Sequence, residues 1–254
     1  MRTAFLAALA VLLLPSGGRG AEPAPAAEQP ATPEEKPAPA PAETPVAEAE
    51  LDKLLAGWQA KGAESSTVVT KFVCVENLAL LAKPRTTTGR IEIRKPDGYR
   101  RTTLDQKTGQ TRGLMILKPP DLWVYLPDLK EAEHYDLARL EPQADASPSK
   151  VLGDLTSFQV ERLRQRFAIK AFKEADGAFR LEYAPLKGKA FAGIEKLRLW
   201  MRPGAGFPEK LETSTAGGDV RLETYSETSL DQKLDEALFK FKPPAGVKMT
   251  EVAK

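Results

Sequence analysis

Side chains that often carry catalysis or bind metals are scarce in this sequence. His134 is the only histidine and Cys74 the only cysteine, so a zinc site with ordinary ligands is not expected. A Ser-His-Asp or Cys-His arrangement would have to use His134, and no G-x-S-x-G motif accompanies it. His134 lies between Glu133 and Tyr135 and is better interpreted as a surface residue. The sequence therefore does not predict an enzyme.

The remaining candidates for chemistry have simpler structural explanations. Carboxylates such as Asp121, Asp128 and Glu131 are plentiful, but acid and base catalysis needs a positioned pair with shifted pKa values. Gly217 and Gly218 lie between strand-like runs and are typical of a turn rather than a phosphate-binding loop. Cys74 lies in a β-branched run, which favours a buried thiol. We predict a binding protein without metal or cofactor.

Charge gives no sign of a nucleic-acid partner. The formal net charge is +2 at pH 7, and acidic and basic residues are interspersed. Nucleic-acid binding generally needs a concentrated positive surface. No nucleic acid is expected as a partner.

The first 20 residues are typical of a secretory signal peptide. Arg2 precedes an apolar run from Ala4 to Leu14, and Pro15 and small residues lead to Gly20. The run is too short to span a bilayer. We predict cleavage near Gly20 and no lipid anchor, because the only cysteine, Cys74, lies far from the cleavage region. An uncleaved signal anchor is the alternative.

Residues 21–48 are rich in proline, alanine and glutamate. Such a stretch can bury little apolar surface and favours extended polyproline II conformations, which predicts a disordered tail. Residues 49–254 remain, about 200 residues, the size of one all-β domain.

A helix is predicted at the start of this domain. Leu51, Leu54, Leu55 and Trp58 recur at helical spacing within Val46 to Lys61, which predicts one apolar stripe. Gly62 is a plausible end of the helix.

Beyond the helix the sequence predicts an antiparallel meander of strands. A short second helix is compatible with Val151 to Gln165. The hairpin of Phe167 to Phe172 and Phe179 to Tyr183 around Asp176 and Gly177 is the clearest. The other strands are expected at Val68 to Glu76, Arg90 to Lys95 and Lys196 to Arg202, with turns at Lys107 to Gln110, Pro203 to Gly206 and Ala216 to Asp219.

The strand from Asp121 to Leu126 is apolar on both faces. Trp123 and Tyr125 alternate with Leu122, Val124 and Leu126, so the two sets point to opposite sides. Each face needs an apolar partner, either protein or lipid. The sequence leaves open which face meets which partner.

Several segments together resemble the LolA family of periplasmic lipoprotein carriers, over roughly Leu51 to Val252. The segments occur in the order typical of the family, beginning with an amphipathic helix and a strand that contains Phe72. The later segments are G-x-I-x-I-x-K-P at Gly89 to Pro96 with Tyr99 and Arg100, D-L-W-V-Y-L-P-D at Asp121 to Asp128, S-P-S-K-V-L at Ser147 to Leu152, and a closing strand at Phe239 to Val247.

The resemblance implies a mainly β (α+β) fold, a curved antiparallel half-barrel with short helices covering its concave apolar face. It also implies a monomeric periplasmic carrier that shields the acyl chains of lipoproteins, or another lipid. The carrier would accept cargo from an inner-membrane donor transporter and deliver it to an outer-membrane acceptor. Each exposed CH₂ costs about 0.8 kcal/mol in water, which is why acyl chains need such a carrier.

The resemblance and the strand alternation together assign candidate site residues. Leu51, Leu54, Leu55 and Trp58 form the expected lid helix. The family usually has an arginine before the strand's proline, as a lid latch; here Arg94 and Lys95 are the candidates, and lysine donates fewer, less rigidly arranged hydrogen bonds. The expected lipid-binding cavity comprises Phe72, Ile91, Ile93, Tyr99, Trp123, Tyr125, Leu197, Leu199 and Met201.

A second function remains open at this point. Fold does not fix function, and the same half-barrel could serve a lipid-sensing or regulatory envelope protein that binds a protein partner. A carrier exchanges lipid with membranes, whereas a sensor holds a stable partner.

Overall fold

The computed structural model describes residues 44–140, 159–187 and 194–252. The predicted signal peptide, most of the predicted tail and the Ser147 to Leu152 motif lie outside the described residues.

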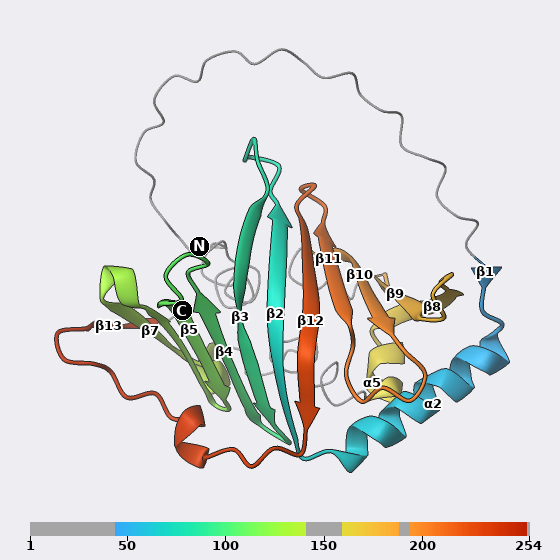
Figure 1. Cartoon of the computed structure of the whole chain (residues 1–254), viewed down its shortest axis with the longest axis horizontal. Helices are drawn as coiled ribbons and strands as arrows, with labels where there is room; N and C mark the ends of the chain where they lie inside the picture. Colours follow the sequence, from blue (N-terminus) through green and yellow to red (C-terminus); the bar gives the residue numbers. More distant parts are fainter. Residues whose placement is uncertain (1–43, 141–158, 188–193, 253–254) are drawn as a thin grey trace.

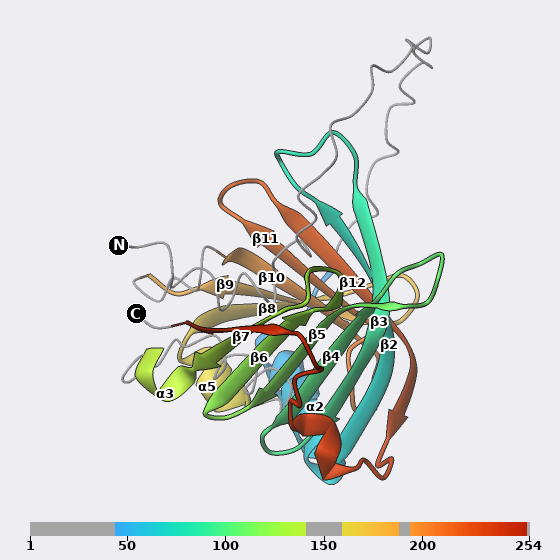
Figure 2. The same cartoon turned by 90° about the vertical axis from the view of Figure 1, so that its left-hand side faces the viewer.

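The described strands form one strongly curved sheet, which wraps into an open half-barrel (Figures 1 and 2). This confirms the predicted mainly β fold. In spatial order the strands are β1 (Thr44–Pro45), β8 (Phe167–Lys173), β9 (Phe179–Pro185), β10 (Ile194–Met201), β11 (Lys210–Thr215), β12 (Val220–Leu230), β2 (Thr67–Asn77), β3 (Arg85–Arg94), β4 (Gly98–Leu104), β5 (Thr111–Lys118), β6 (Asp121–Leu126), β7 (Glu131–Asp136) and β13 (Lys248–Val252).

The sheet consists of two meanders that meet at its centre. Strands β2 to β7 and strands β8 to β12 each pair in sequence order, all antiparallel. The predicted hairpin between β8 and β9 is present. Strand β12 then pairs with β2, and β13 pairs with β7 in parallel. These last two pairings join segments distant in sequence, and local patterns did not predict them.

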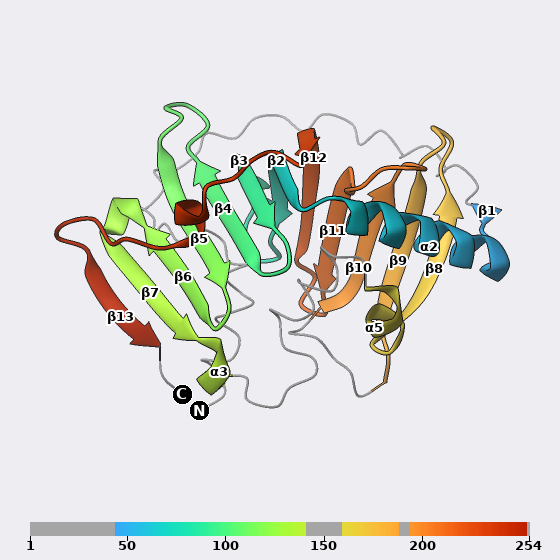
Figure 3. The same cartoon turned by 90° about the horizontal axis from the view of Figure 1, so that it is seen from below.

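Helix α2 (Glu48–Glu64) runs across β8 to β11 (Figure 3). It continues two residues beyond Gly62, where we expected its end. The expected domain boundary at residue 49 lies inside this helix. Just before the helix, Thr44 and Pro45 form β1, which pairs with β8, and the Val46 N–H donates to the Ala171 carbonyl at 2.9 Å. The other described helical segments are α3 (Leu137–Leu140), α5 (Val160–Arg164), η1 (Pro127–Leu129) and η2 (Glu236–Phe239).

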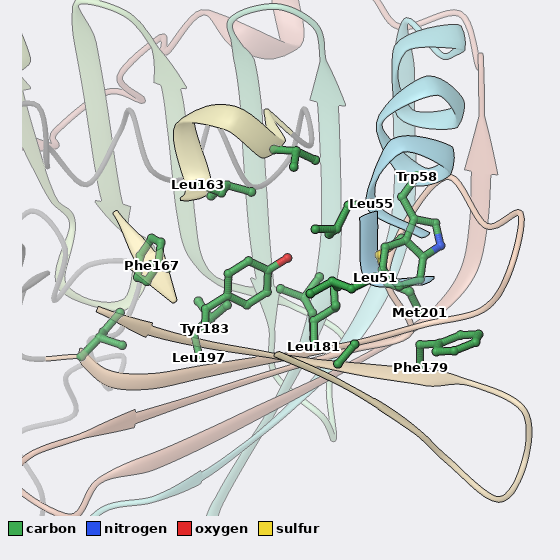
Figure 4. Packing of buried hydrophobic residues seen from close by; sticks show 14 residues of the cluster. Leu51, Leu55, Trp58, Leu163, Phe167, Phe179, Leu181, Tyr183, Leu197 and Met201 are labelled. Atoms are coloured by element: carbon green, nitrogen blue, oxygen red, sulfur yellow. The ribbon is translucent and has the colours of Figure 1, made fainter. Parts of the chain in front are cut away.

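Two buried apolar clusters occupy the concave face within the described residues. The first, which we call the lid cluster, lies between α2, α5 and strands β8 to β10 (Figure 4). It includes Leu51, Leu55, Trp58, Leu163, Phe167, Phe179, Leu181, Tyr183, Ile194, Leu197, Leu199 and Met201. The second, which we call the strand cluster, lies over β2 to β7 and includes Val68, Phe72, Cys74, Ile91, Ile93, Tyr99, Met115, Leu117, Leu122 and Tyr135.

The closing segment differs from the prediction. Phe239 ends η2, and the residues from Lys240 to Val247 form no strand. The segment instead crosses the outer face of β4 to β6, where Phe241 packs on Trp123, and strand β13 begins only at Lys248. Its two lysines and two consecutive prolines are poorly suited to a sheet ladder, because proline has no N–H to donate.

Candidate functional site

Strand pairing defines which side chains share the concave face. In an antiparallel ladder, directly paired residues project to the same side. Ile93 pairs with Val68 and with Tyr99, and Ile91 pairs with Arg101. Phe72 pairs with Gly89 and Tyr225. The predicted cavity residues Phe72, Ile91, Ile93 and Tyr99 therefore share the concave face, and all four are buried in the strand cluster.

The other predicted cavity strand, β10, contributes to the lid cluster. Leu197, Leu199 and Met201 pair with Tyr183, Leu181 and Phe179, respectively. All six side chains are buried in that cluster. The sequence-predicted cavity residues on the concave face thus fall into two groups, with β11 and β12 between their strands.

The lid helix α2 places its predicted stripe on the lid cluster. Leu51, Leu55 and Trp58 are buried and Leu54 is half-buried. The Trp58 ring packs edge-on against Phe179, with ring centroids 6.3 Å apart, and its Nε1–H donates to the Arg202 carbonyl at 3.2 Å. The lid therefore fills the concave face of β8 to β10 with its own side chains.

Of the two latch candidates, only Lys95 reaches the lid helix. Its ammonium group donates a hydrogen bond to the Gly62 carbonyl, in the last turn of α2. Arg94 lies on the outer face, with its guanidinium 5.2 Å from the centroid of the Phe239 ring. Burial lowers the pKa of Lys95, and Asp231 opposes that change.

Trp123 and Tyr125 do not share the face of the other predicted cavity residues. Trp123 pairs with Ile116 and Tyr125 with Leu114, whereas Leu122 and Val124 pair with the strand-cluster residues Leu117 and Met115. Their grouping with Ile91 and Ile93 is therefore corrected. The physical reason is that a strand with apolar residues on both sides can bury either side against the core. Here the closing segment covers the outer face, where Trp123 and Tyr125 lie.

These outer-face rings form a compact aromatic stack. Trp123 stacks on His134 at 4.0 Å and on Phe241 at 5.1 Å between ring centroids, and Tyr125 lies 5.7 Å from Phe241. The stack thus joins β6 and β7 to the segment that precedes β13.

His134 is less exposed than the sequence suggested, and it joins three strands. Its Nε2 lies 2.8 Å from Asp121 Oδ1 on β6, and its Nδ1 lies 2.7 Å from Glu251 Oε2 on β13. Burial disfavours the charged ring, but the hydrogen bonds to both carboxylates outweigh it and raise the pKa of His134. His134 thus fastens the edge strand β13.

Sequence reasoning missed a group of charged residues on the concave face, which we call the central charged cluster: Glu76, Arg101, Arg221 and Glu223. Arg101 Nη1 lies 2.9 Å from Glu223 Oε1, and Arg221 Nη2 lies 2.5 Å from the same oxygen. Arg221 Nη1 lies 3.7 Å from Glu76 Oε1. The alternation of Arg221, Glu223 and Tyr225 was visible in the sequence, but the sequence did not show which face of the sheet these residues share.

The two carboxylates of the central charged cluster have pKa values shifted in opposite directions. Burial opposes the ionisation of Glu223, but the charges of Arg101 and Arg221 lower its pKa to about 2. For Glu76 burial is the stronger effect and raises the pKa, although Arg221 and Arg85 oppose it. Glu223 is therefore the firmly ionised partner of the arginines.

Among the described residues, no group of three or more histidine, cysteine, aspartate or glutamate side chains is arranged to hold a metal ion. No helix in the described ranges is long and apolar enough to cross a membrane.

The arrangement defines an open β half-barrel with an apolar concave face, and a helical lid covers the part of that face formed by β8 to β11. Residues 63–242 match the model of the family described as outer membrane lipoprotein carrier protein LolA. The chain therefore belongs to the LolA family, whose fold binds lipids or lipoproteins.

Several solved structures are similar to this chain at low sequence identity. A conserved protein from Thermus thermophilus is 10% identical, with a TM-score of 0.48, and the match covers 80% of this chain and 99% of that one. A LolA superfamily protein from Nitrosomonas europaea is 11% identical, with a TM-score of 0.39 and coverage of 75% and 97%. A structure of the Pseudomonas aeruginosa MucA/MucB complex matches at 13% identity, with a TM-score of 0.42 and coverage of 76% and 61%. A comparison with curated protein sequences gives no match.

Proposed function

We propose that this protein is a periplasmic carrier that holds the acyl chains of a lipoprotein, or of another lipid, on its concave face between the inner and outer membranes. The observation that carries the proposal is the lid cluster, in which Leu51, Leu55 and Trp58 of α2 cover Leu181, Leu199 and Met201. These contacts join a single helix to the sheet, so they can separate without unfolding the strands.

The lid gives a physical account of reversible binding. With α2 seated, its own apolar side chains occupy the concave face of β8 to β10. An acyl chain would replace them, so the free energy gained from the cargo is offset by the lid contacts that are lost. Such competition keeps net affinity moderate, and a carrier needs moderate affinity because its acceptor must bind the cargo more tightly.

Few polar contacts hold the lid beyond its apolar stripe. They include the Trp58 bond to the Arg202 carbonyl, the Lys95 bond to the Gly62 carbonyl and an ion pair between Asp52 and Arg164 of α5. Opening of α2 would break these polar contacts together with the apolar contacts of Leu51, Leu55 and Trp58. No bond chemistry is part of the proposed function: the protein acts through differential affinity for its cargo. The proposal also includes export through the predicted signal peptide, receipt of cargo from a donor transporter and delivery of cargo to an acceptor.

The test is whether lipid co-purifies with the mature chain and depends on the concave face. Ile93→Glu and Leu199→Glu place a carboxylate in the strand cluster and in the lid cluster, and each should abolish lipid detected by mass spectrometry. Trp200→Glu is the matched control, because Trp200 lies beside Leu199 on the opposite face of β10. Circular dichroism must show that each variant is folded. Unchanged lipid content in the folded concave-face variants would refute the proposal.

A regulatory role is the alternative, and one feature of the outer face favours it. A cavity of about 360 Å³ lies beside the closing segment, lined in part by Lys118, Trp123 and Phe241. A sensor would hold a stable protein partner there whose affinity changes with lipid. Affinity capture with and without lipid, compared between wild type and Trp123→Ala, separates this role from the carrier role.

A further inference from the structure

The loop between β2 and β3 exposes large apolar side chains. Leu80 is 97% exposed and Leu81 is 50% exposed. The hairpin that carries them projects beyond the neighbouring strands of the sheet (Figures 1 and 2). A leucine this exposed contributes nothing to the core of the domain, so a contact outside the chain would account for it better.

The loop is held in a defined conformation. The Leu81 N–H donates to the Leu78 carbonyl at 2.9 Å, which closes a turn. The Ala79 N–H donates to Asp219 Oδ1 at 2.8 Å, which ties the loop to the neighbouring hairpin of β11 and β12. Both bonds fix the backbone from which Leu80 and Leu81 project.

The loop's composition suits a membrane surface. Residues 78–84 read L-A-L-L-A-K-P and contain Lys83 but no acidic residue. Asp219 lies at the base of the loop, where its carboxylate accepts the Ala79 N–H. Apolar side chains beside a lysine suit the boundary between acyl chains and anionic headgroups, where lysine extends to the headgroups.

The loop also lies next to the concave face. Strand β2 places Phe72, Cys74 and Glu76 on that face, where they pair with Tyr225, Glu223 and Arg221, and the strand then ends at Asn77. The exposed leucines follow within a few residues. A membrane in contact with them would lie at the rim of the face that the proposed cargo enters.

We propose that this loop, which we call the leucine tip, docks the protein on a lipid bilayer by inserting Leu80 and Leu81 at the bilayer interface. The inference rests on the proposed function, because it supplies the contact through which a lipid carrier would approach a membrane. Two inserted leucines provide reversible binding, as a carrier that must leave the membrane requires.

The experiment uses the mature chain and vesicles of phosphatidylethanolamine and phosphatidylglycerol in a flotation assay. Wild type should float with the vesicles, and the double variant Leu80→Gln with Leu81→Gln should partition roughly tenfold less. The matched control is Leu129→Gln, a leucine 53% exposed in η1, which should bind like wild type. Equal binding by wild type and the double variant would overturn the proposal, as would absence of binding by wild type.

A fluorescent probe locates the contact independently. Cys74 is buried, and burial raises its pKa, so a thiol-reactive nitrobenzoxadiazole dye should label Leu81→Cys selectively. Its emission should shift to the blue when vesicles are added, whereas the dye on Leu129→Cys should not respond. A shift that appears without vesicles as protein concentration rises would identify a second copy of the chain as the partner and overturn the proposal.

Failure of the leucine tip can be distinguished from failure of the carrier function. The double variant leaves the concave face intact and should retain co-purified lipid. Leu199→Glu should lose that lipid but still float with vesicles. A double variant that loses co-purified lipid while still floating would contradict the assignment of the tip to membrane docking.

Discussion

Arg101 of β4 and Glu223 of β12 form an ion pair across the concave face, with Arg101 Nη1 2.9 Å and 3.1 Å from the two carboxylate oxygens. Strands β2 and β3 lie between them in the sheet. The arginine crosses this gap over the Phe72 ring, 3.7 Å from its centroid. Phe72 in turn packs over Gly89, where a Cβ would come within 2.6 Å of the ring. The ion pair thus links the two meanders where they meet.

Replacing Glu223 should therefore weaken the fold. Glu223→Gln leaves Arg101 and Arg221 without their main counter-charge in a buried place, and we expect a loss of about 3 kcal/mol in the free energy of unfolding. Urea unfolding measures this. Glu76→Gln is the matched control on the neighbouring strand and should cost less than about 1 kcal/mol, because burial already disfavours the Glu76 charge. Equal losses would contradict the assigned roles.

The same ion pair should depend on pH in a defined window. The folded-state pKa of Glu223 is about 2, below the ordinary value of about 4.3. A depressed carboxyl pKa contributes stability above the ordinary pKa, and this contribution disappears as pH falls through the folded-state value. The difference in unfolding free energy between wild type and Glu223→Gln should therefore shrink as pH falls from about 4 to about 2. A constant difference would refute this account.

His134 should give the edge strand β13 the opposite pH dependence. Because its folded-state pKa is raised, its contribution is fully present below the ordinary pKa of about 6.5 and is lost as pH rises through the raised value. Hydrogen exchange, corrected for the intrinsic effect of pH, should show weaker protection of Lys248 to Val252 in alkaline buffer. His134→Phe keeps an aromatic ring against Trp123 and should remove the dependence. The same pH response in that variant would exclude His134 as its source.

The bond between Lys95 and the Gly62 carbonyl should hold the lid helix closed. Lys95→Met removes a charged donor while keeping most of the side-chain volume, so we expect opening of α2 to become easier by about 1.5 kcal/mol. Hydrogen exchange of α2 amides measures the change. Arg94→Met is the control, because Arg94 lies on the other face and does not contact the lid. Faster exchange of α2 in the control alone would contradict the latch role.

The sequence predicted those features that depend on local periodicity. The stripe of Leu51, Leu55 and Trp58 faces the sheet as its spacing indicated, and the hairpin around Asp176 and Gly177 has the expected strands. Alternation also placed Ile91 with Ile93, and Leu197 with Leu199. In each case the pattern that carries the prediction lies within one helix, strand or hairpin.

Features that depend on distant partners were not predicted. Trp123 alternates with Val124 in a strand apolar on both sides, and the partner of the outer face, Phe241 of the closing segment, is distant in sequence. Likewise, Arg101 and Glu223 are far apart in sequence and meet because β12 pairs with β2. A single sequence contains no local signal for such a pairing.

Transfer of an acylated lipoprotein between two vesicle populations tests the central claim most directly. Donor vesicles carry a fluorescently labelled, acylated lipoprotein, acceptor vesicles carry none, and the mature chain is added in catalytic amount. The account predicts faster transfer with wild type, no acceleration with Leu199→Glu, and acceleration by Trp200→Glu as by wild type. Transfer at the uncatalysed rate with folded wild type, or equal acceleration by Leu199→Glu, would contradict it.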